Sequence, residues 1–378
     1  MSRVGVVGVG LVKVKEHWGE SLESLFTQAA LKALEEAGVE VDKLYVGNMC
    51  GPVMQNQLNL GAHLAQALGV HGLPAIRVEA GSASGGLAVH EAYQAVKSGK
   101  SKAALVVGVE KMSDVLPEDV SSALSMEEDY EYTAYTGVTK SGVAAMVHRM
   151  YLDSYATAED VCMMAVKSHE HAEGCSHAQY PFRMSLERAM ASPMEADPIH
   201  MMECSGVGDG AAAVVLAPLE GGGVELAGTA VSTDYSSLAQ RKDPLFLESA
   251  ASAARKAYEE AGVGPSDVGL AEVHDDFTIT GLLSIEALGL AGKGEAWRMV
   301  VDGEVDLGGR LPVNTFGGLK ARGNPLGATG VYQVAELYLQ LSGSAGDHQV
   351  DKADVGVALN MGGLGSTSVV NVLRRVEA

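Results

Sequence analysis

The stretch that decides the fold is ALKALEEAGV, residues 30–39, because it returns as ARKAYEEAGV at residues 254–263 with eight of ten positions identical. Each copy predicts a helix that ends just before a glycine, Gly38 or Gly262. An Asp-containing loop and a strand follow each time, as VDKLYVGNM and then SDVGLAEVHDDF. The shared order of helix, glycine, loop and strand, at an offset of 224 residues, indicates an internal duplication.

The boundary between the two copies is expected at APLEGGGVELAG (217–228), where a run of glycines separates two apolar stretches. This gives an N-terminal half, 1–220, and a C-terminal half, 221–378. Strands alternate with helices in both, which predicts an α/β fold with mostly parallel sheets covered by helices. Residues from about 113 to 205 form an insertion rich in Met, His, Tyr and charge, which we expect to fold as a helical lid.

Composition excludes several classes of function. The chain has 378 residues and a net charge of −21, so no basic surface is concentrated enough to replace the counterions of a nucleic acid. The four cysteines lie far apart, without a CxxC pair, as in reduced intracellular proteins. The apolar run at the N-terminus is too short to span a membrane. We therefore expect a cytoplasmic protein with neither nucleic-acid nor membrane partners.

Two motifs resemble ligand-binding sequences, but neither has the full pattern of such a site. VGVVGVGLV (4–12) contains the Gly-x-Gly of a dinucleotide loop, but the third glycine and the helix that should follow are missing, so we interpret it as a core strand. KSHEHAEGCSH (167–177) contains three histidines and a cysteine, but His169 and His171 point to different faces of the predicted helix. A zinc site needs converging ligands, and we therefore expect a polar lid helix and no metal.

A possible nucleophile position lies in RVEAGSASGGLAVHEAY (77–93), which reads as a strand end, a loop of small residues and a helix. Such a turn directs free backbone N–H groups at one point and often presents a nucleophile there. The residue at this turn is Ser82.

Three further stretches carry candidate ligands. The apolar strand of LAEVHDDFTI (270–279) ends at His274, Asp275 and Asp276, and ligands in α/β proteins collect at such strand ends. Two glycine-rich stretches, NTFGGLKARGNPLGATG (314–330) and VALNMGGLGSTSVV (357–370), allow a ligand to approach the backbone closely. The first carries two positive charges suited to a phosphate or carboxylate. Their candidate residues are Asn314, Lys320, Arg322, Asn324, Asn360 and Gly363.

Taken together, these segments resemble the thiolase superfamily, in particular its archaeal and sterol-carrier-protein-X types. The similarity runs the whole length, through VEAGSASGG, YTGVTKSGVAAMVHRMY, SPMEADPI, GDGAAAVVLA, EVHDDFTI, GGLKARGNPLGATG and NMGGLGST. It implies two βαβαβαββ halves in α-β-α-β-α layers, a homodimer or tetramer, and a coenzyme A thioester as substrate, without a further cofactor. Lys320, Arg322, Asn314 and Gly363 are then expected to contact the substrate or its coenzyme A.

The resemblance also implies a catalytic set from which this chain departs. Such enzymes use an acylated cysteine, a histidine in a GHP loop that activates it, a histidine of HDxF that binds the thioester oxygen, and a second cysteine that moves the α-proton. Here Ser82 replaces the nucleophile, Asn324 the activating histidine and Asp276 the cysteine of HDCF, and only His274 matches. A serine without a neighbouring base is a poor nucleophile.

Three functions are compatible with this pattern. The first is a thiolase-like acyltransferase that forms or cleaves a 3-oxoacyl-CoA, with Ser82, His274 and Asn324 lining its site. The second is an aldol-type enzyme on an acyl-CoA, in which Asp276, with a raised pKa in a partly dry pocket, moves the α-proton while His274 and Asn324 hold the enolate oxygen. The third is a non-catalytic subunit of a larger complex, for which the resemblance implies a small zinc-ribbon or OB-fold partner.

Overall fold

A computed structural model describes residues 3–351 and 353–377. Its core is a nine-stranded sheet in the order β3-β2-β4-β7-β1-β8-β11-β10-β9, and a two-stranded hairpin, β5-β6, lies apart from it. The strands are β1 (Val4–Leu11), β2 (Lys43–Gly47), β3 (Ala75–Val78), β4 (Ala104–Glu110), β5 (Met194–Ala196), β6 (Ile199–His200), β7 (Gly210–Pro218), β8 (Gly223–Thr233), β9 (Leu270–Glu272), β10 (Val355–Gly362) and β11 (Thr367–Val376).

The sheet consists of two similar parts. In the first part, β3, β2 and β4 are parallel to one another. Strand β7 then pairs antiparallel with β4, and β1 pairs antiparallel with β7. In the second, β9 and β10 are parallel, with β11 and β8 antiparallel beyond them. The parts join where β1 pairs with β8 at two positions. Mostly parallel sheets were expected, and this is wrong for β7, β1, β8 and β11, because the sequence pattern of a strand does not reveal its direction. The expected boundary at 220 falls in the turn between β7 and β8.

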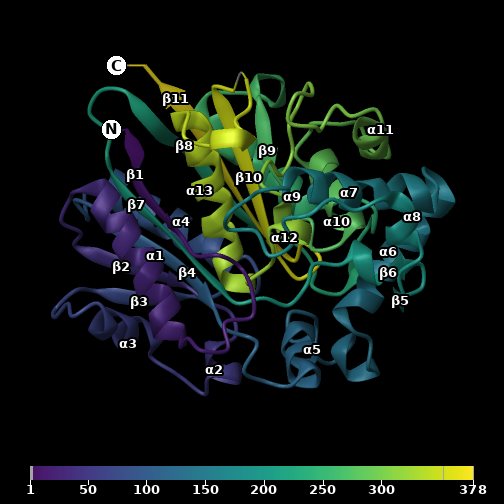
Figure 1. The fold of residues 1–378 in the computed structure, drawn as a ribbon, viewed down its shortest axis with the longest axis horizontal. Helices are drawn as coiled ribbons and strands as arrows, with labels where there is room; N and C mark the ends of the chain where they lie inside the picture. Colours follow the sequence, from purple (N-terminus) through teal and green to yellow (C-terminus); the bar gives the residue numbers. More distant parts are fainter. Residues whose placement is uncertain (1–2, 352, 378) are drawn as a thin grey trace.

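The helices cover and separate the two parts. Helices α4 and α13 pack against each other and contact strands of both parts, α1 covers β1 and β7, and α9 covers β8 and β11 (Figure 1). The helices are α1 (Leu22–Ala37), α2 (Gly51–Met54), α3 (Leu60–Ala67), α4 (Ser84–Lys97), α5 (Pro117–Ser125), α6 (Lys140–Ser154), α7 (Ala158–His171), α8 (Leu186–Met190), α9 (Glu248–Ala261), α10 (Thr278–Ala287), α11 (Ala296–Val301), α12 (Gly318–Ala321) and α13 (Thr329–Ser342).

The repeated sequence forms equivalent structure. Helices α1 and α9 each end just before a glycine, as predicted. The backbone of these glycines, Gly38 (φ 59°) and Gly262 (φ 69°), is in the left-handed conformation. Each helix packs so closely on its strand that a Cβ at Gly8 would lie 2.3 Å from the carbonyl oxygen of Ala33, and one at Gly228 would lie 2.3 Å from that of Ala257. Gly8 and Gly10 of VGVVGVGLV therefore allow α1 to pack on β1, in agreement with the interpretation of this stretch as a core strand.

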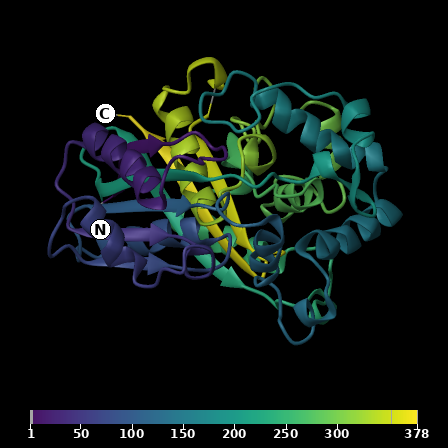
Figure 2. The same cartoon turned by 60° about the horizontal axis from the view of Figure 1, so that its bottom comes forward.

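The insertion forms the expected helical lid, with α5 to α8 and the hairpin β5-β6. In Figure 2 its teal helices lie in an outer arc on the side away from α1. Although it interrupts the N-terminal half in sequence, α7 packs against α10, α11 and α12 of the C-terminal half. The lid thereby places its own side chains beside the loops that follow β9.

We predict that Gly228→Ala lowers the free energy of unfolding by roughly 1–3 kcal/mol, because the added methyl would overlap the backbone of α9. The matched control is Gly19→Ala, where a Cβ would meet nothing within 4 Å. Urea unfolding of the two variants checks this. Equal midpoints would show that the close contact between β8 and α9 contributes nothing to stability.

Candidate active site

Ser82 lies in the turn before α4, as the sequence predicted, and it is completely buried. Asn360 of β10 holds this turn from the other half of the molecule. Its amide nitrogen donates to the Ser82 carbonyl (3.1 Å) and its amide oxygen accepts from the backbone N–H of Gly86 (3.0 Å). The close approach expected at the break in NMGG is therefore the contact between Asn360 and the start of α4.

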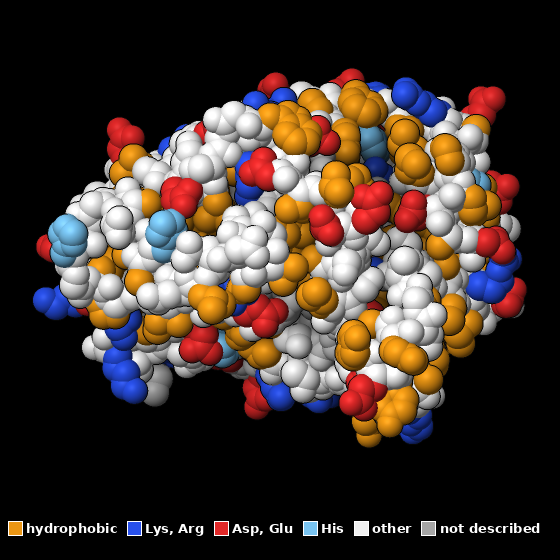
Figure 3. Space-filling model, turned by 90° about the horizontal axis from the view of Figure 1, so that it is seen from below, with side chains coloured by type: hydrophobic (Ala, Val, Ile, Leu, Met, Phe, Trp, Pro, Cys, Tyr) orange, Lys and Arg blue, Asp and Glu red, His pale blue; other side chains and the backbone are white. Residues whose placement is uncertain are grey.

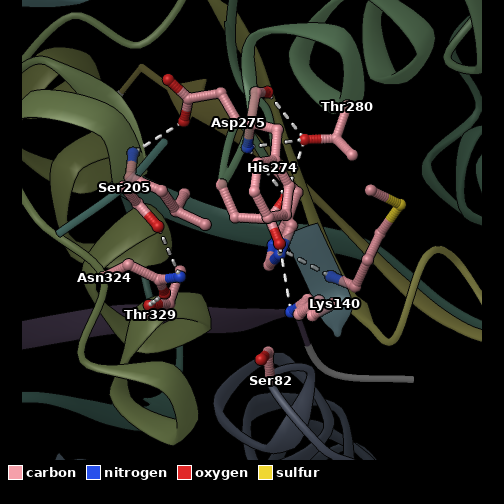
Figure 4. A network of polar contacts seen from close by, with 12 residues as sticks. Ser82, Lys140, Ser205, His274, Asp275, Thr280, Asn324 and Thr329 are labelled. Atoms are coloured by element: carbon pink, nitrogen blue, oxygen red, sulfur yellow. Dashed lines mark hydrogen bonds and ion pairs between the residues drawn. The ribbon is translucent and has the colours of Figure 1, made fainter. Parts of the chain in front are cut away.

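The Ser82 hydroxyl has no base. The polar atom nearest to it in hydrogen-bonding geometry is the sulfur of Met49, at 3.9 Å. In Figure 4 Ser82 stands apart from the network of contacts above it. Asn324, at the position of the activating histidine, has its amide oxygen occupied by the Thr329 hydroxyl (2.8 Å) and donates to Ser205 (3.3 Å). An unactivated hydroxyl at neutral pH is a weak nucleophile.

His274 is a fixed hydrogen-bond donor. Its Nδ1 accepts from the backbone N–H of Met361 (3.2 Å), which leaves the proton on Nε2. Burial lowers the pKa of His274 to about 4, so the ring is neutral near pH 7. Among the described residues Nε2 has no hydrogen-bond partner, and it lies 3.8 Å from Oδ2 of Asp276. The ring is fully buried and lines neither of the cavities described below, whereas Asp276 beside it lines one.

A buried ion triad, not foreseen from the sequence, dominates the site. The Lys140 ammonium lies between the carboxylates of Glu127 (2.7 Å) and Asp276 (3.1 Å). Lys140 is the first residue of α6, where a cation opposes the helix dipole, so the two carboxylates account for its position. Lys140 directly follows Thr139, whose side chain caps α6, and the sequence analysis did not single out either residue.

The raised pKa predicted for Asp276 is wrong. Burial alone would raise it, but Lys140 and His274 hold the pKa of this carboxyl below its usual value. The Thr280 hydroxyl (2.6 Å) and the backbone N–H of Phe277 (3.1 Å) also donate to Asp276. Asp276 is therefore ionised throughout the neutral range.

Glu127 occupies a site of two converging backbone donors. Its Oε1 accepts from the N–H groups of Ser82 and Gly363, the latter at 3.1 Å. Paired N–H groups of this kind bind carboxylates and other oxyanions. Because the lid's own carboxylate fills this position, a thioester oxygen reaches it only if Glu127 moves.

Two cavities flank the triad. One, which we call the apolar cavity, has a volume of about 440 Å³ and is lined by Lys140, Asp276, Asn324 and Lys320, together with lid side chains. The other, of about 490 Å³, is lined by Glu127 and Gly363 with Arg77 and Glu79. Ser82 lines neither of them.

The remaining predicted ligands divide into two groups. Lys320 and Gly363 each line a cavity. Arg322 is instead fully buried in an ion pair with Glu336 of α13 (3.1 Å), and Asn314 accepts the Val273 N–H (2.7 Å) in a left-handed turn. The structure does not bring the Arg322 and Asn314 side chains to a cavity, so a direct contact with substrate stays a prediction for them.

Within residues 3–351 and 353–377, no group of three or more His, Cys, Asp and Glu side chains has the arrangement of a metal site. His169 and His171 of KSHEH each hydrogen-bond a backbone carbonyl, at Phe182 and Val313. In the same part of the chain, no helix combines the length and apolarity needed to cross a bilayer.

The duplicated fold and the buried polar site are features of an enzyme. Sequence comparison identifies its family. Residues 5–220 match the thiolase N-terminal domain and residues 230–375 the thiolase C-terminal domain. The chain belongs to the thiolase family, and the predicted class, an enzyme of the thiolase acyltransferase type, is confirmed.

Three similar proteins illustrate its relationships within and around this family. The chain is 40% identical to an acetyl-CoA acetyltransferase of Methanothermobacter thermautotrophicus, over 99% of this chain and all of that one. It is 32% identical to sterol carrier protein 2 of Rattus norvegicus, over 99% of this chain and 72% of that one. A solved structure described as Ltp2-ChsH2(DUF35) aldolase superimposes with a TM-score of 0.83 at 23% identity, over 99% of this chain and 98% of that one.

We predict that Lys140→Met lowers the free energy of unfolding at pH 7 by roughly 3–5 kcal/mol, because Glu127 and Asp276 keep buried charges without a partner. The control is Lys100→Met, at an exposed lysine. A triple variant with Glu127→Gln and Asp276→Asn as well should recover most of the loss.

The pH dependence of this loss has a definite sign. Lys140 depresses the pKa of both carboxyls in the folded state, so its stabilisation is complete above their unfolded values of about 4. It disappears as the pH falls through the depressed folded values. Urea unfolding between pH 3 and 8 should show the Lys140→Met deficit shrinking below about pH 4. A deficit that is the same at all pH values would contradict the ion triad.

Proposed function

We propose that this protein makes or breaks a carbon–carbon bond at the α-carbon of a coenzyme A thioester, and that it does so without an acyl-enzyme at Ser82. The observation that carries this proposal is the contrast between the Ser82 hydroxyl, which contacts no base among the described residues, and Asp276 and Lys140, which form an ion pair, line a cavity and lie next to His274. The acyl-CoA substrate is supported by the acetyl-CoA acetyltransferases among its relatives.

The proposed chemistry begins with the thioester oxygen. His274 Nε2–H has no hydrogen-bond partner in the part of the chain that the structure describes, and the Asn324 amide donates only a long hydrogen bond to Ser205 (3.3 Å). Both groups are neutral donors held by other contacts, so they require little reorganisation when negative charge develops on an enolate oxygen. Lys140, at the wall of the same cavity, adds a positive charge nearby.

Asp276 is the proposed base for the α-proton. It is ionised, lies 3.8 Å from the donor nitrogen of His274, and lines the cavity. Its low pKa makes it a weaker base than a raised carboxyl, and the cation of Lys140 offsets this by stabilising the enolate that forms. The enolate then attacks a carbonyl carbon, or is released when the bond is cleaved.

The missing acyl-enzyme favours an aldol-type reaction, in which the carbonyl belongs to an aldehyde or ketone. The structural neighbour described as an aldolase supports the compatibility of this fold with such chemistry. Acyl transfer through Ser82 is the second candidate, favoured by the position of Ser82 at the start of α4 next to paired N–H groups. It requires Glu127 to leave those groups and another residue to act as base.

Assembly with other subunits is part of the proposal. The lid exposes a group of large apolar side chains next to α5, and Figure 3 shows hydrophobic side chains among carboxylates on the face that carries this helix. Surfaces of this kind commonly receive a protein partner. A second copy of the chain or a small zinc-ribbon or OB-fold protein is proposed there. The exposed residues are Leu116, Met126, Tyr130, Tyr132 and Tyr135.

The first test follows exchange of the acyl α-protons of acetyl-CoA in D₂O by mass spectrometry. We expect Asp276→Asn to slow exchange by about 10²-fold or more, the usual contribution of a positioned base, and Ser82→Ala to leave it within a few-fold of the native rate. Because His274 is already neutral and Asp276 already ionised, the native rate should be flat from about pH 5 to 8. Equal rates in the native and Asp276→Asn proteins would remove Asp276 as the base.

The second test is the intact mass after incubation with acetoacetyl-CoA. The native protein should carry no acyl adduct, because the Ser82 hydroxyl is not activated, whereas Ser82→Cys should become acylated, since a thiol is the more intrinsically nucleophilic group. An adduct localised to Ser82 in the native protein would establish acyl transfer through serine and overturn the non-covalent reaction.

A further inference from the structure

The apolar cavity is lined by two buried lysines with opposite surroundings. Lys140 has two carboxylates within 3.1 Å. Lys320, which is 4% exposed, has no Asp or Glu oxygen within 4 Å among the residues that the structure describes. Both line the same cavity. One cation is fully compensated within the protein, and the other is not.

The partner of Lys320 is a neutral nitrogen. Its ammonium lies 3.3 Å from Nε2 of His169 in α7, and the Nδ1–H of that ring donates to the Phe182 carbonyl (3.0 Å). The proton on Nδ1 leaves Nε2 as a bare acceptor. Burial and the charge of Lys320 lower the pKa of His169 to about 4, so the ring supplies no charge. The ring of Tyr180, 5.5 Å from the ammonium, adds only a weak cation–π contact.

Lys320 is held rigidly in this position. The backbone N–H of Leu319, the residue before it, donates to Asp275 (2.7 Å), and Asp275 accepts from Ser168 of α7 as well. The next charged residue along α12, Arg322, is neutralised by Glu336. Lys320 is therefore part of a built wall and not a surface side chain that happens to fold inward.

A desolvated ammonium without a carboxylate in contact is unfavourable, and burial lowers the pKa of Lys320 to about 8 although Asp275, farther away, raises it. An anion delivered by a ligand would remove this penalty. Phe182, Met201 and Met202 give the same cavity apolar surface suited to an acyl chain, and Glu195 also lines it.

We propose that Lys320, with His169 as its support, binds a carboxylate at the far end of the acyl group, so that the preferred substrates are carboxyacyl thioesters. This rests on the proposed function and names its substrate class. Lys320 shares its cavity with Asp276, the proposed base, whereas the long pantetheine arm keeps the phosphates of coenzyme A far from the thioester. One ammonium also matches one carboxylate better than a phosphate, which usually takes several donors.

The experiment measures binding of glutaryl-CoA, valeryl-CoA and free coenzyme A to the full chain by calorimetry. The two thioesters have acyl chains of equal length and differ in the terminal carboxylate. We expect the native protein to bind glutaryl-CoA roughly 10- to 100-fold more tightly than valeryl-CoA, as for one charge-assisted contact. Lys320→Met and Lys320→Gln should abolish this preference and leave valeryl-CoA binding within about threefold, which also shows that the variants fold.

Each other outcome is decisive. Equal affinity of the native protein for the two thioesters would overturn the carboxylate site and leave the proposed function standing. Equal weakening of all three ligands by Lys320→Met would assign the anion to coenzyme A itself. If the native protein binds neither thioester nor coenzyme A, the proposed function fails, and the substrate class fails with it.

Discussion

The contact on which the site depends is the Lys140 ammonium between Glu127 and Asp276. It connects three parts of the chain, because Glu127 and Lys140 come from the lid, Asp276 follows β9, and Glu127 also accepts the N–H groups of Ser82 and Gly363. Loss of Lys140 leaves two buried carboxylates without their cation. The triad thus positions the lid against both halves and determines which groups at the centre are charged.

The departures from the thiolase pattern are consistent with one another once the triad is included. In the thiolase pattern a histidine deprotonates the cysteine nucleophile. Here neutral groups replace both residues, Ser82 in place of the cysteine and Asn324 in place of the histidine. The negative charge of the site is instead on Glu127 and Asp276, and Lys140 compensates one of these two charges. In the proposed reaction, this carboxylate–ammonium network takes the place of a thiolate–imidazolium pair. A decayed site would not be expected to acquire a buried lysine with two well-placed partners.

The sequence placed Ser82, His274 and Asn324 in one site, whereas in the structure it is Asn360 that contacts both Ser82 and His274, and Asn324 lines a cavity that Ser82 does not line. The duplication and the helices of the insertion were predictable because they depend on short segments whose pattern is visible in the sequence. The glycines after each repeated helix and the strand end at HDD belong to this group. Strand direction in β7 and β11 was out of reach, since it depends on the path of the connections. Glu127 and Lys140 were missed because a lid residue gives no local sign of its distant partner, and the pKa of Asp276 was mistaken for the same reason. Arg322 was read as a free cation because Glu336, which neutralises it, lies in a separate helix.

Charge balance in the apolar cavity constrains what it can bind. The chain carries a net charge of −21, so its long-range field disfavours anionic ligands, and any attraction for them must come from groups at close range. Lys140 contributes little of that attraction while Glu127 and Asp276 remain paired with it. Movement of Glu127 away from Ser82 and Gly363 would at once free two N–H donors and leave Lys140 with one carboxylate. A ligand oxygen that replaces the Glu127 carboxylate at this point therefore meets a more positive site than the resting structure presents, and opening of the lid and binding of a thioester become energetically coupled.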